Sequence, residues 1–127
     1  MSGKKEDHKP EKFHSMPMVA LAEVMRVYGY GGEKYARYNY LEGYPYYKSI
    51  DALMRHFMAF VDDTQDDLDE SGHHHLAHAA WHIMNLLNMS LQPERYGQFD
   101  DRQEVARVTH PEYYDADAGF HQDKPEA

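Results

Sequence analysis

Apolar residues recur at three- and four-residue intervals in three separate stretches of the chain. This spacing predicts three amphipathic helices, over about residues 18–28, 45–62 and 74–89. A further short helix is expected near 102–108, and no stretch shows the alternation typical of a strand. The pattern therefore predicts an all-α fold, a compact helical bundle of three to four main helices.

Glycine and serine residues suggest where these helices begin and end. Gly29, Gly31 and Gly32 are expected to stop the first helix, because glycine is common at helix ends. A short helical turn over 33–38 is expected after them. Ser71 and Gly72 are expected to start the third helix.

The chain has 127 residues, which is enough for one compact domain with a single core. Residues 1–17 are polar and contain Pro10 and Pro17, which predicts an irregular N-terminal arm. The helical domain is expected over 18–92. A C-terminal extension with a polar tail is expected over 93–127.

Composition narrows the classes of partner. A formal net charge of −9 argues against binding a nucleic-acid polymer through its phosphates. No apolar run is long enough to span a membrane and the start of the chain is charged, so no membrane association and a cytoplasmic location are expected. With no cysteine, a metal must be held by His, Asp, Glu or backbone oxygen, which points to Mg²⁺, Mn²⁺ or Zn²⁺.

Histidines form a polar ridge on the third predicted helix. The ridge residues fall at i, i+3, i+7 and i+10 and are His75, His78, His82 and Asn85. A corresponding ridge on the second helix consists of Ala52, His56, Ala59 and Asp63. If the two helices are antiparallel the ridges can face each other, as metal ligands do in helical bundles. The alternative is a hydrogen-bonded helix interface without metal. His73 and His74 are expected to be solvated.

The connection between the second and third helices is acidic. Six carboxylates lie within nine residues: Asp62, Asp63, Asp66, Asp67, Asp69 and Glu70. Mg²⁺ binds one or two carboxylates and leaves room for substrate phosphates, so this run can supply metal ligands. The alternative is a solvated, self-repelling loop.

Tyrosines crowd the segment between residues 28 and 47. Lys34, Arg37 and Asn39 are interleaved with them and can offer a cation for phosphate and an amide for a base edge. The alternative is an aromatic core beneath a long connection. The glycines do not match a phosphate-binding Walker loop, because no Ser or Thr follows the lysine.

Several motifs in order carry a resemblance to a known family. They are the arm with Lys5, Asp7, Lys9 and Pro10, the Tyr28-Gly29 pair, the Lys34-Tyr35 and Asn39-Tyr40 pairs, Arg55-His56, and Glu70-Ser71-Gly72 followed by His75 and His78. Over about residues 3–90 the chain resembles the N-terminal domain of phage-type dATP/dGTP diphosphohydrolases. That family looks related to the MazG-like all-α nucleotide pyrophosphohydrolases.

The resemblance implies metal-dependent hydrolysis of purine deoxynucleoside triphosphates to monophosphate and pyrophosphate, by a homo-oligomer using Mg²⁺ or Mn²⁺. If the chain is phage-encoded, its location is the host cytoplasm. The expected catalytic residues are His56, Glu70, His75 and His78. The expected metal ligands are Asp63, Asp67, Asp69, Glu70, His75 and His78. The expected substrate-binding residues are Lys9, Lys34, Tyr35, Asn39 and Arg55.

Two other functions stay open on the residues alone. In one, the protein is a non-catalytic phage interaction protein and the histidine ridge is an interface. In the other, it is a Zn²⁺-dependent hydrolase of a substrate that is not a nucleotide.

Overall fold

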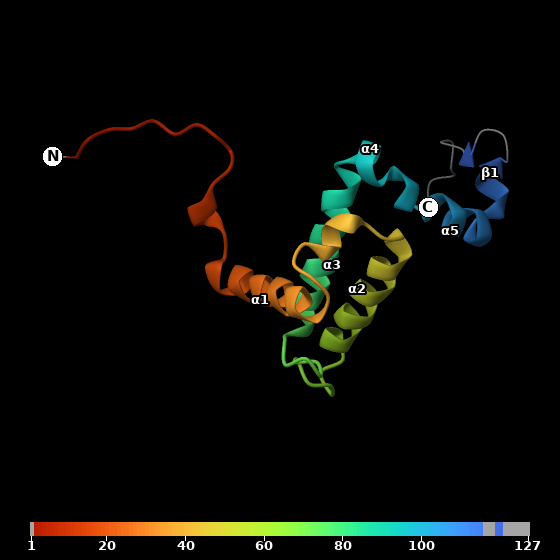
Figure 1. The fold of residues 1–127 in the computed structure, drawn as a ribbon, viewed down its shortest axis with the longest axis horizontal. Coiled ribbons are helices and arrows are strands. Elements are labelled where there is room, and N and C mark those ends of the chain that lie inside the picture. Colours follow the sequence, from red (N-terminus) through yellow and green to blue (C-terminus); the bar gives the residue numbers. More distant parts are fainter. Residues whose placement is uncertain (1, 116–118, 121–127) are drawn as a thin grey trace.

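The computed structural model describes residues 2–115 and 119–120, and this part of the chain is mainly helical. Three long helices form the centre: α1 (Met18–Lys34), α2 (Tyr46–Val61) and α3 (His75–Ser90). The shorter helices α4 (Pro93–Tyr96) and α5 (Arg102–Thr109) follow (Figure 1). The predicted all-α fold class is confirmed, and α2, α3 and α5 fall within one or two residues of their predicted bounds.

Short elements connect or flank these helices. The 3₁₀ turns are η1 (Phe13–Ser15), η2 (Asn39–Glu42), η3 (Gly97–Phe99) and η4 (Pro111–Tyr113). Strands β1 (Tyr114–Asp115) and β2 (Gly119–Phe120) pair antiparallel, which the sequence pattern did not predict. No helix among the described residues is long and apolar enough to cross a membrane.

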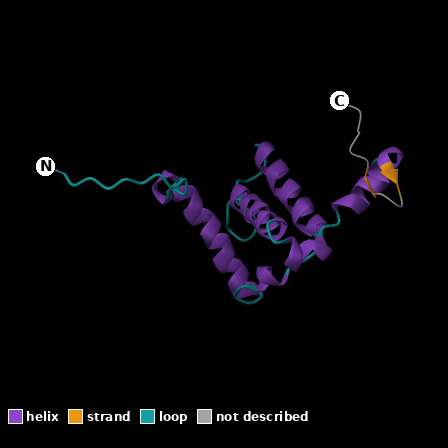
Figure 2. Ribbon diagram, turned by 90° about the horizontal axis from the view of Figure 1, so that it is seen from above, coloured by secondary structure: helices purple, strands orange, loops and turns teal. Residues whose placement is uncertain are grey.

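α2 and α3 lie side by side and run in opposite directions, joined by the acidic connection, while α1 packs on α3 (Figures 1 and 2). The buried apolar side chains are Val27, Tyr46, Ala77, Ala79, Met89 and Tyr96. The core near the start of α2 joins Tyr46, Met89 and Tyr96. α3 is therefore the central helix, with α1 and α2 on two of its sides.

The glycines after Tyr28 do not end α1, contrary to prediction. The helix continues to Lys34, so the turn expected over 33–38 is also wrong, and a turn occurs at η2 instead. Contacts on both sides of Gly29 explain the continuation: the Tyr28 hydroxyl donates to Asn85, and the Tyr30 ring packs on His73. Tertiary contacts offset the cost of about 1 kcal/mol that each helical glycine carries.

α3 begins differently from the prediction. His74, not Ser71, is its N-cap, and the His74 Nδ1 accepts the backbone N–H of Leu76 at 3.0 Å. His73 and His74 are half-buried rather than solvated, because their rings contact Tyr30 and Phe60 respectively. Ser71 is thereby free to take a different role beside the histidines.

Residues after α3 fold back onto the tyrosine-rich segment. The buried Tyr96 donates its hydroxyl to the Leu41 carbonyl at 2.7 Å. Gly43 has φ +83°, and a β-carbon there would collide with the rings of Phe99 and Tyr96. α4 and η3, which belong to the predicted C-terminal extension, thus fix the end of the tyrosine-rich segment.

The N-terminal arm and, at the other end of the described chain, most of α5 extend away from this bundle (Figure 1). The N-terminal arm projects to one side, with η1 its only regular element among the described residues (Figure 1). Nearly all of its described side chains are exposed. Most of the expected polar tail lies outside the described residues.

Candidate metal centre and tyrosine-lined cavity

Three side chains that can ligate a metal meet between α2 and α3. His56 comes from α2, His78 from α3, and Asp69 from the acidic connection; their ligand atoms all lie within 4.8 Å of one another. The histidines of the two polar ridges face each other, as their spacing predicts for antiparallel helices, whereas Asn85 bonds Tyr28 of α1 and the Asp63 side chain is exposed. We call these three residues the His-Asp-His cluster.

Ser71 holds two members of this cluster in place. Its hydroxyl donates to Asp69 Oδ1 and lies 2.9 Å from His78 Nε2, and its backbone N–H donates to the same carboxylate oxygen at 2.9 Å. The second oxygen of Asp69 lies 3.1 Å from His78 Nε2, and the side chains of His78 and Asp69 are only 12% and 7% exposed. Sequence reasoning gave Ser71 a capping role and missed this one.

Other histidines surround the cluster. Nδ1 of His56 lies 2.9 Å from Nδ1 of His75, so one ring donates and the other accepts. The His56 ring stacks on His78 at a centroid distance of 4.6 Å and lies 6.2 Å from the ring of His82. His75, His78 and His82 are thus brought to one place by the helical spacing of α3.

Burial favours the neutral form of His56, His78 and His82. Desolvation, together with the neighbouring imidazoles, lowers the pKa of His56. Desolvation also lowers the pKa of His78, although Asp69 opposes this, and it lowers the pKa of His82 to about 4. A neutral imidazole has a free lone pair, which is the form that binds a metal.

Asp69 stays ionised although it is largely covered. Its burial acts to raise the pKa of the carboxyl group, but the two hydrogen bonds from Ser71, with smaller contributions from His78 and His56, outweigh this and hold the pKa below its ordinary value. The cluster therefore presents two neutral nitrogen donors and one anionic oxygen donor.

A chain of hydrogen bonds leads from His82 towards α1. His82 Nδ1 lies 2.8 Å from the Ser49 hydroxyl, which lies 2.6 Å from the Tyr44 hydroxyl. The Asn85 amide donates to Tyr44 at 3.3 Å and accepts from the Tyr28 hydroxyl at 2.7 Å. Ser49 and Asn85 are buried, so this chain satisfies polar groups that water does not reach.

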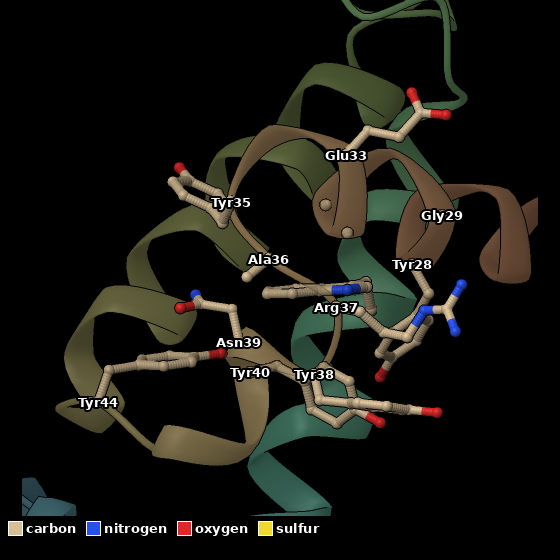
Figure 3. Close-up of a pocket in the computed structure, with 13 residues that line it drawn as sticks. Tyr28, Gly29, Glu33, Tyr35, Ala36, Arg37, Tyr38, Asn39, Tyr40 and Tyr44 are labelled. Atoms are coloured by element: carbon tan, nitrogen blue, oxygen red, sulfur yellow. The ribbon is translucent and has the colours of Figure 1, made fainter.

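The far end of this chain forms the wall of a cavity of about 630 Å³. Six of the thirteen lining residues are aromatic, and the lining comes from the second half of α1, the segment after it, and α3: Tyr28, Tyr35, Arg37, Tyr38, Asn39, Tyr40, Tyr44 and Trp81, with Gly29, Gly31, Gly32, Glu33 and Ala36. Figure 3 shows Arg37 close to Tyr28, with Asn39 and Tyr44 across the cavity. We call it the tyrosine-lined cavity.

Two features mark this cavity as more than a packing defect. Tyr38 has a left-handed backbone conformation with φ +66°, which is costly for a residue with a bulky side chain and concentrates at functional sites. Desolvation, with Tyr40 and Tyr44 nearby, raises the pKa of Tyr28, so its hydroxyl stays a hydrogen-bond donor.

The cavity lies next to the histidines. Trp81 lines it, and the Trp81 ring centroid is 4.7 Å from that of His82. On α1, Lys34 Nζ lies 5.3 Å from the ring of Tyr35, which lines the cavity, and 6.0 Å from the ring of Tyr30. Tyr30 in turn contacts the ring of His73.

Some predicted site residues lie outside both the His-Asp-His cluster and the tyrosine-lined cavity. The side chains of Asp63, Asp67 and Glu70 are exposed and fall outside the His-Asp-His cluster, so their roles as ligands stay predictions. Asp67 contributes its backbone carbonyl, which accepts the His75 N–H at 2.8 Å. Lys9 lies in the projecting arm.

Arg55 is exposed on α2, one residue before His56. Its charge lies close enough to help lower the pKa of His56 and of His82, although burial and the other histidines do more. Tyr35 and Asn39 line the tyrosine-lined cavity, as already described. The structure thus places Arg55 near the histidines and the two other residues at the cavity, while their roles stay predictions.

The donor set decides which ions suit the cluster. Two imidazole nitrogens and one carboxylate oxygen are typical of transition ions such as Mn²⁺, whereas Mg²⁺ prefers oxygen ligands throughout. The residues present therefore suit a divalent cation, with Mn²⁺ a better match than Mg²⁺.

Fold and site together define an all-α protein with a candidate metal centre beside an aromatic cavity. The chain belongs to the family described as dATP/dGTP diphosphohydrolase, N-terminal, whose model matches residues 1–102. The expected family membership is thus confirmed, over a longer stretch than the motifs covered, while the relation to MazG-like proteins stays a prediction. No curated protein and no solved structure matches the chain.

Proposed function

We propose that this protein hydrolyses the purine deoxynucleoside triphosphates dATP and dGTP to the monophosphate and pyrophosphate, with a divalent metal ion. The observation that carries the proposal is the juxtaposition of the His-Asp-His cluster with the tyrosine-lined cavity, linked through His82 and Trp81. The family's name supports the reaction and the substrate class. In the overall step, water adds to the α-phosphorus and the bond to the bridging oxygen of pyrophosphate breaks.

We assign the His-Asp-His cluster to the metal. When bound there, the ion would supply positive charge for the phosphates and acidify a water molecule. Ser71 orients Asp69 and His78 through its hydroxyl, and His75 fixes the ring of His56 through the Nδ1 contact. Such supporting contacts preserve the tautomer and direction that ligation needs.

We assign the role of general base to Glu70. Its exposed carboxylate follows Asp69 directly, and no hydrogen bond or ion pair engages it in the described part of the chain. An ionised carboxylate with free lone pairs can accept the proton of an attacking water. Asp63 and Asp67, also exposed in the same connection, can ligate a second ion once phosphates are present.

We assign the base and sugar of the nucleotide to the tyrosine-lined cavity. Its aromatic walls, Tyr35 and Trp81 among them, offer faces on which a purine can stack. Asn39 has both a donor and an acceptor for the base edge or the sugar hydroxyl. A volume of about 630 Å³ is ample for a nucleoside.

Local cations counter the protein's net charge of −9, which by itself repels a tetra-anionic substrate. Lys34 lies near the ring of Tyr35, Arg37 lines the cavity, and Arg55 lies beside His56. We propose that these three side chains meet the phosphates. Lys9 joins them only if the arm folds over the cavity.

The direct test incubates the full chain with each of the four common deoxynucleoside triphosphates and Mn²⁺, Mg²⁺ or Zn²⁺, with an EDTA control. We expect pyrophosphate and monophosphate from dATP and dGTP, faster with Mn²⁺ than with Mg²⁺. Asp69→Asn is expected to abolish turnover, while Asp51→Asn, at an exposed position on α2, serves as the matched control. Release of orthophosphate instead of pyrophosphate, or no turnover of any nucleotide, would refute the proposal.

The same experiment separates the two alternative functions. Stabilisation by Zn²⁺ without nucleotide turnover would favour a hydrolase of another substrate. Neither turnover nor any response of the melting temperature to metal would favour a non-catalytic interaction protein.

A further inference from the structure

His82 on α3 has one neighbour in each part of the candidate site. Its ring centroid is 6.2 Å from that of His56, a member of the His-Asp-His cluster. It is 4.7 Å from the ring centroid of Trp81, which lines the tyrosine-lined cavity. His82 is not itself a member of the cluster, so its chemistry depends on what its two ring nitrogens do.

The hydrogen-bond chain that reaches His82 has a direction. The Tyr28 hydroxyl donates to Oδ1 of Asn85, and the Asn85 amide nitrogen donates to the Tyr44 hydroxyl oxygen. The next link joins the Tyr44 and Ser49 hydroxyls, which are 2.6 Å apart. A phenol is a stronger acid than an aliphatic alcohol and its oxygen is a poorer acceptor, so Tyr44 donates and Ser49 accepts.

The burial of Ser49 decides the last link of this chain. Ser49 has no exposed surface, so its own hydroxyl hydrogen needs a partner inside the protein. Among the described residues the remaining partner of this hydroxyl is Nδ1 of His82, at 2.8 Å. Nδ1 therefore accepts and carries no proton. Desolvation lowers the pKa of His82 to about 4, so the ring is neutral at neutral pH and its single proton is on Nε2.

The Nε2–H group of His82 is free to bind a ligand. No hydrogen bond engages this nitrogen in the described part of the chain, where the bond of the ring is made by Nδ1. Nor is Nε2 shut off from solvent, because the unpaired polar side-chain atom that is fully buried there is Oδ1 of Asp101. The two nitrogens of an imidazole face nearly opposite directions, so the Nε2–H group points away from Ser49.

We propose that His82 donates a hydrogen bond from Nε2–H to a non-bridging phosphate oxygen of the nucleotide, an inference that rests on the proposed function. No proton is transferred, because the N–H bond persists while water adds to the α-phosphorus and the bond to pyrophosphate breaks. A donor that is oriented before the reaction stabilises the charge on the phosphate oxygens in the transition state. His82 is then a catalytic residue, and Ser49 and Tyr44 are positioning residues.

A neutral donor suits the neighbourhood of the cluster. A cationic side chain this close to His56 would repel the metal ion assigned to the cluster. A neutral imidazole offers a hydrogen bond to phosphate without that repulsion. The direction of the chain from Tyr28 keeps the proton on the nitrogen that can make this bond.

Nitrogen-15 NMR of the labelled full chain tests the tautomer without nucleotide or metal. The ring signals of His82 are assigned through its backbone amide, in EDTA at neutral pH. We expect a protonated Nε2 and an unprotonated Nδ1. A proton on Nδ1 would overturn the inference, whether or not the protein hydrolyses nucleotides.

Two substitutions separate a phosphate donor from a purely structural role. The amide nitrogen of a glutamine can occupy the place of Nε2, whereas an asparagine reaches only the place of Nδ1, where it can accept from Ser49. We expect His82→Gln to keep kcat within about threefold of the wild type, and His82→Asn to lower kcat by about 100-fold with a smaller change in KM. A purely structural role predicts the reverse order, because only His82→Asn keeps Ser49 paired. His110→Asn, at an exposed position, is the control and is expected to match the wild type.

Steady-state kinetics with dATP and dGTP in Mn²⁺ measure these effects, and circular dichroism verifies that each variant is folded. A His82→Asn protein at least as active as His82→Gln would overturn the inference and leave the proposed function intact. Absence of turnover in the wild type would overturn the proposed function, and this inference with it. The tautomer measurement needs no variant, so it decides the matter even if a substitution prevents folding.

Discussion

The hydroxyl of Ser49 on α2 lies 2.8 Å from Nδ1 of His82 on α3, and Ser49 has no exposed surface. Through this pair the histidines around the His-Asp-His cluster connect with the tyrosines of the cavity. On the other side Ser49 meets the Tyr44 hydroxyl, which lines the cavity. A change at Ser49 therefore acts on both halves of the candidate site.

Replacing Ser49 with alanine tests this connection. Ser49→Ala leaves Nδ1 of His82 without its partner and takes from the Tyr44 hydroxyl one of its two hydrogen bonds, so we expect the free energy of unfolding to fall by about 1 to 3 kcal/mol. Urea denaturation measures it. Ser90→Ala is the control, because Ser90 is exposed and its hydroxyl bonds only a carbonyl on its own helix. Equal stability of the two variants would contradict the role given to Ser49.

Stability is expected to depend on pH through the histidines. His82 has a pKa of about 4 in the folded protein and its ordinary value of 6.5 when unfolded. Between these values the unfolded state binds more protons, so stability is complete above about pH 6.5 and declines as the pH falls towards 4. His56 and His78, whose pKa values are also lowered, act in the same direction. Thermal melting in EDTA measures the decline, and His82→Gln is expected to make it shallower.

Substitutions of the cluster histidines and of neighbouring histidines are expected to change the response of the melting temperature to metal by different amounts. We expect Mn²⁺ to raise the melting temperature of the wild type and of His73→Ala, but not of His78→Ala, with His75→Ala intermediate because it acts through His56. Calorimetric titration with Mn²⁺ gives the affinities directly. A similar loss of Mn²⁺ affinity in all three variants would show that the cluster is not the binding site.

His74→Ala needs a separate reading, because its side chain caps α3. Loss of an N-cap costs about 0.5 to 2 kcal/mol, so we expect a less stable protein whose Mn²⁺ affinity at low temperature is unchanged. His74→Asn, which restores a capping oxygen, is expected to recover the stability. If His74→Asn does not recover the stability, the lost contact with Phe60, and not the lost cap, accounts for the effect.

Replacing Lys34 and replacing Asn39 are expected to change the kinetics in different ways. Lys34→Ala removes a charge that we propose faces phosphate, so KM is expected to rise by a similar factor for every triphosphate. Asn39→Ala removes a donor and an acceptor inside the cavity and is expected to change the ranking among bases or sugars. Steady-state kinetics on two purine and two pyrimidine nucleotides separate them. Unchanged kcat/KM in both variants would mean that the cavity does not hold the nucleotide.

The sequence pattern predicted α2 and α3 because each carries a long apolar stripe at helical spacing. The facing of His56 with His75 and His78 followed from the same spacing, once the helices were taken as antiparallel. Local propensity misled at Gly29, where contacts made by Tyr28 and Tyr30 carry the helix onward. Helices could therefore be predicted from the sequence wherever the apolar periodicity was strong. The positions of their ends depended on contacts from elsewhere in the chain.

The connection between cavity and cluster was not readable in this way. Ser49 and Tyr44 meet residues 33 and 41 positions away, and nothing local marks a serine on an apolar helix as a hydrogen-bond partner. The sequence did offer one signal: Ser49 precedes His56 by seven residues and so shares its helix face. Asp69 could be narrowed only to an acidic run, because the fold of that connection decides which carboxylate points inward.

The hydrogen bond from Tyr96 to Leu41 affects how often the rim of the cavity opens. Leu41 lies in a turn, and its carbonyl accepts hydrogen bonds from the Tyr96 hydroxyl and, at 3.1 Å, from Arg95. A side chain at Gly43 would collide with the Tyr96 ring and prevent this packing. The Leu41 N–H donates to the Tyr38 carbonyl at 2.9 Å, so its exchange with deuterated solvent reports how often this turn opens when the cavity rim detaches from α4. Tyr96→Phe, which keeps the ring but loses the hydroxyl, is expected to speed this exchange without unfolding α2 and α3. The rim would then be the part of the proposed nucleotide site that opens most often.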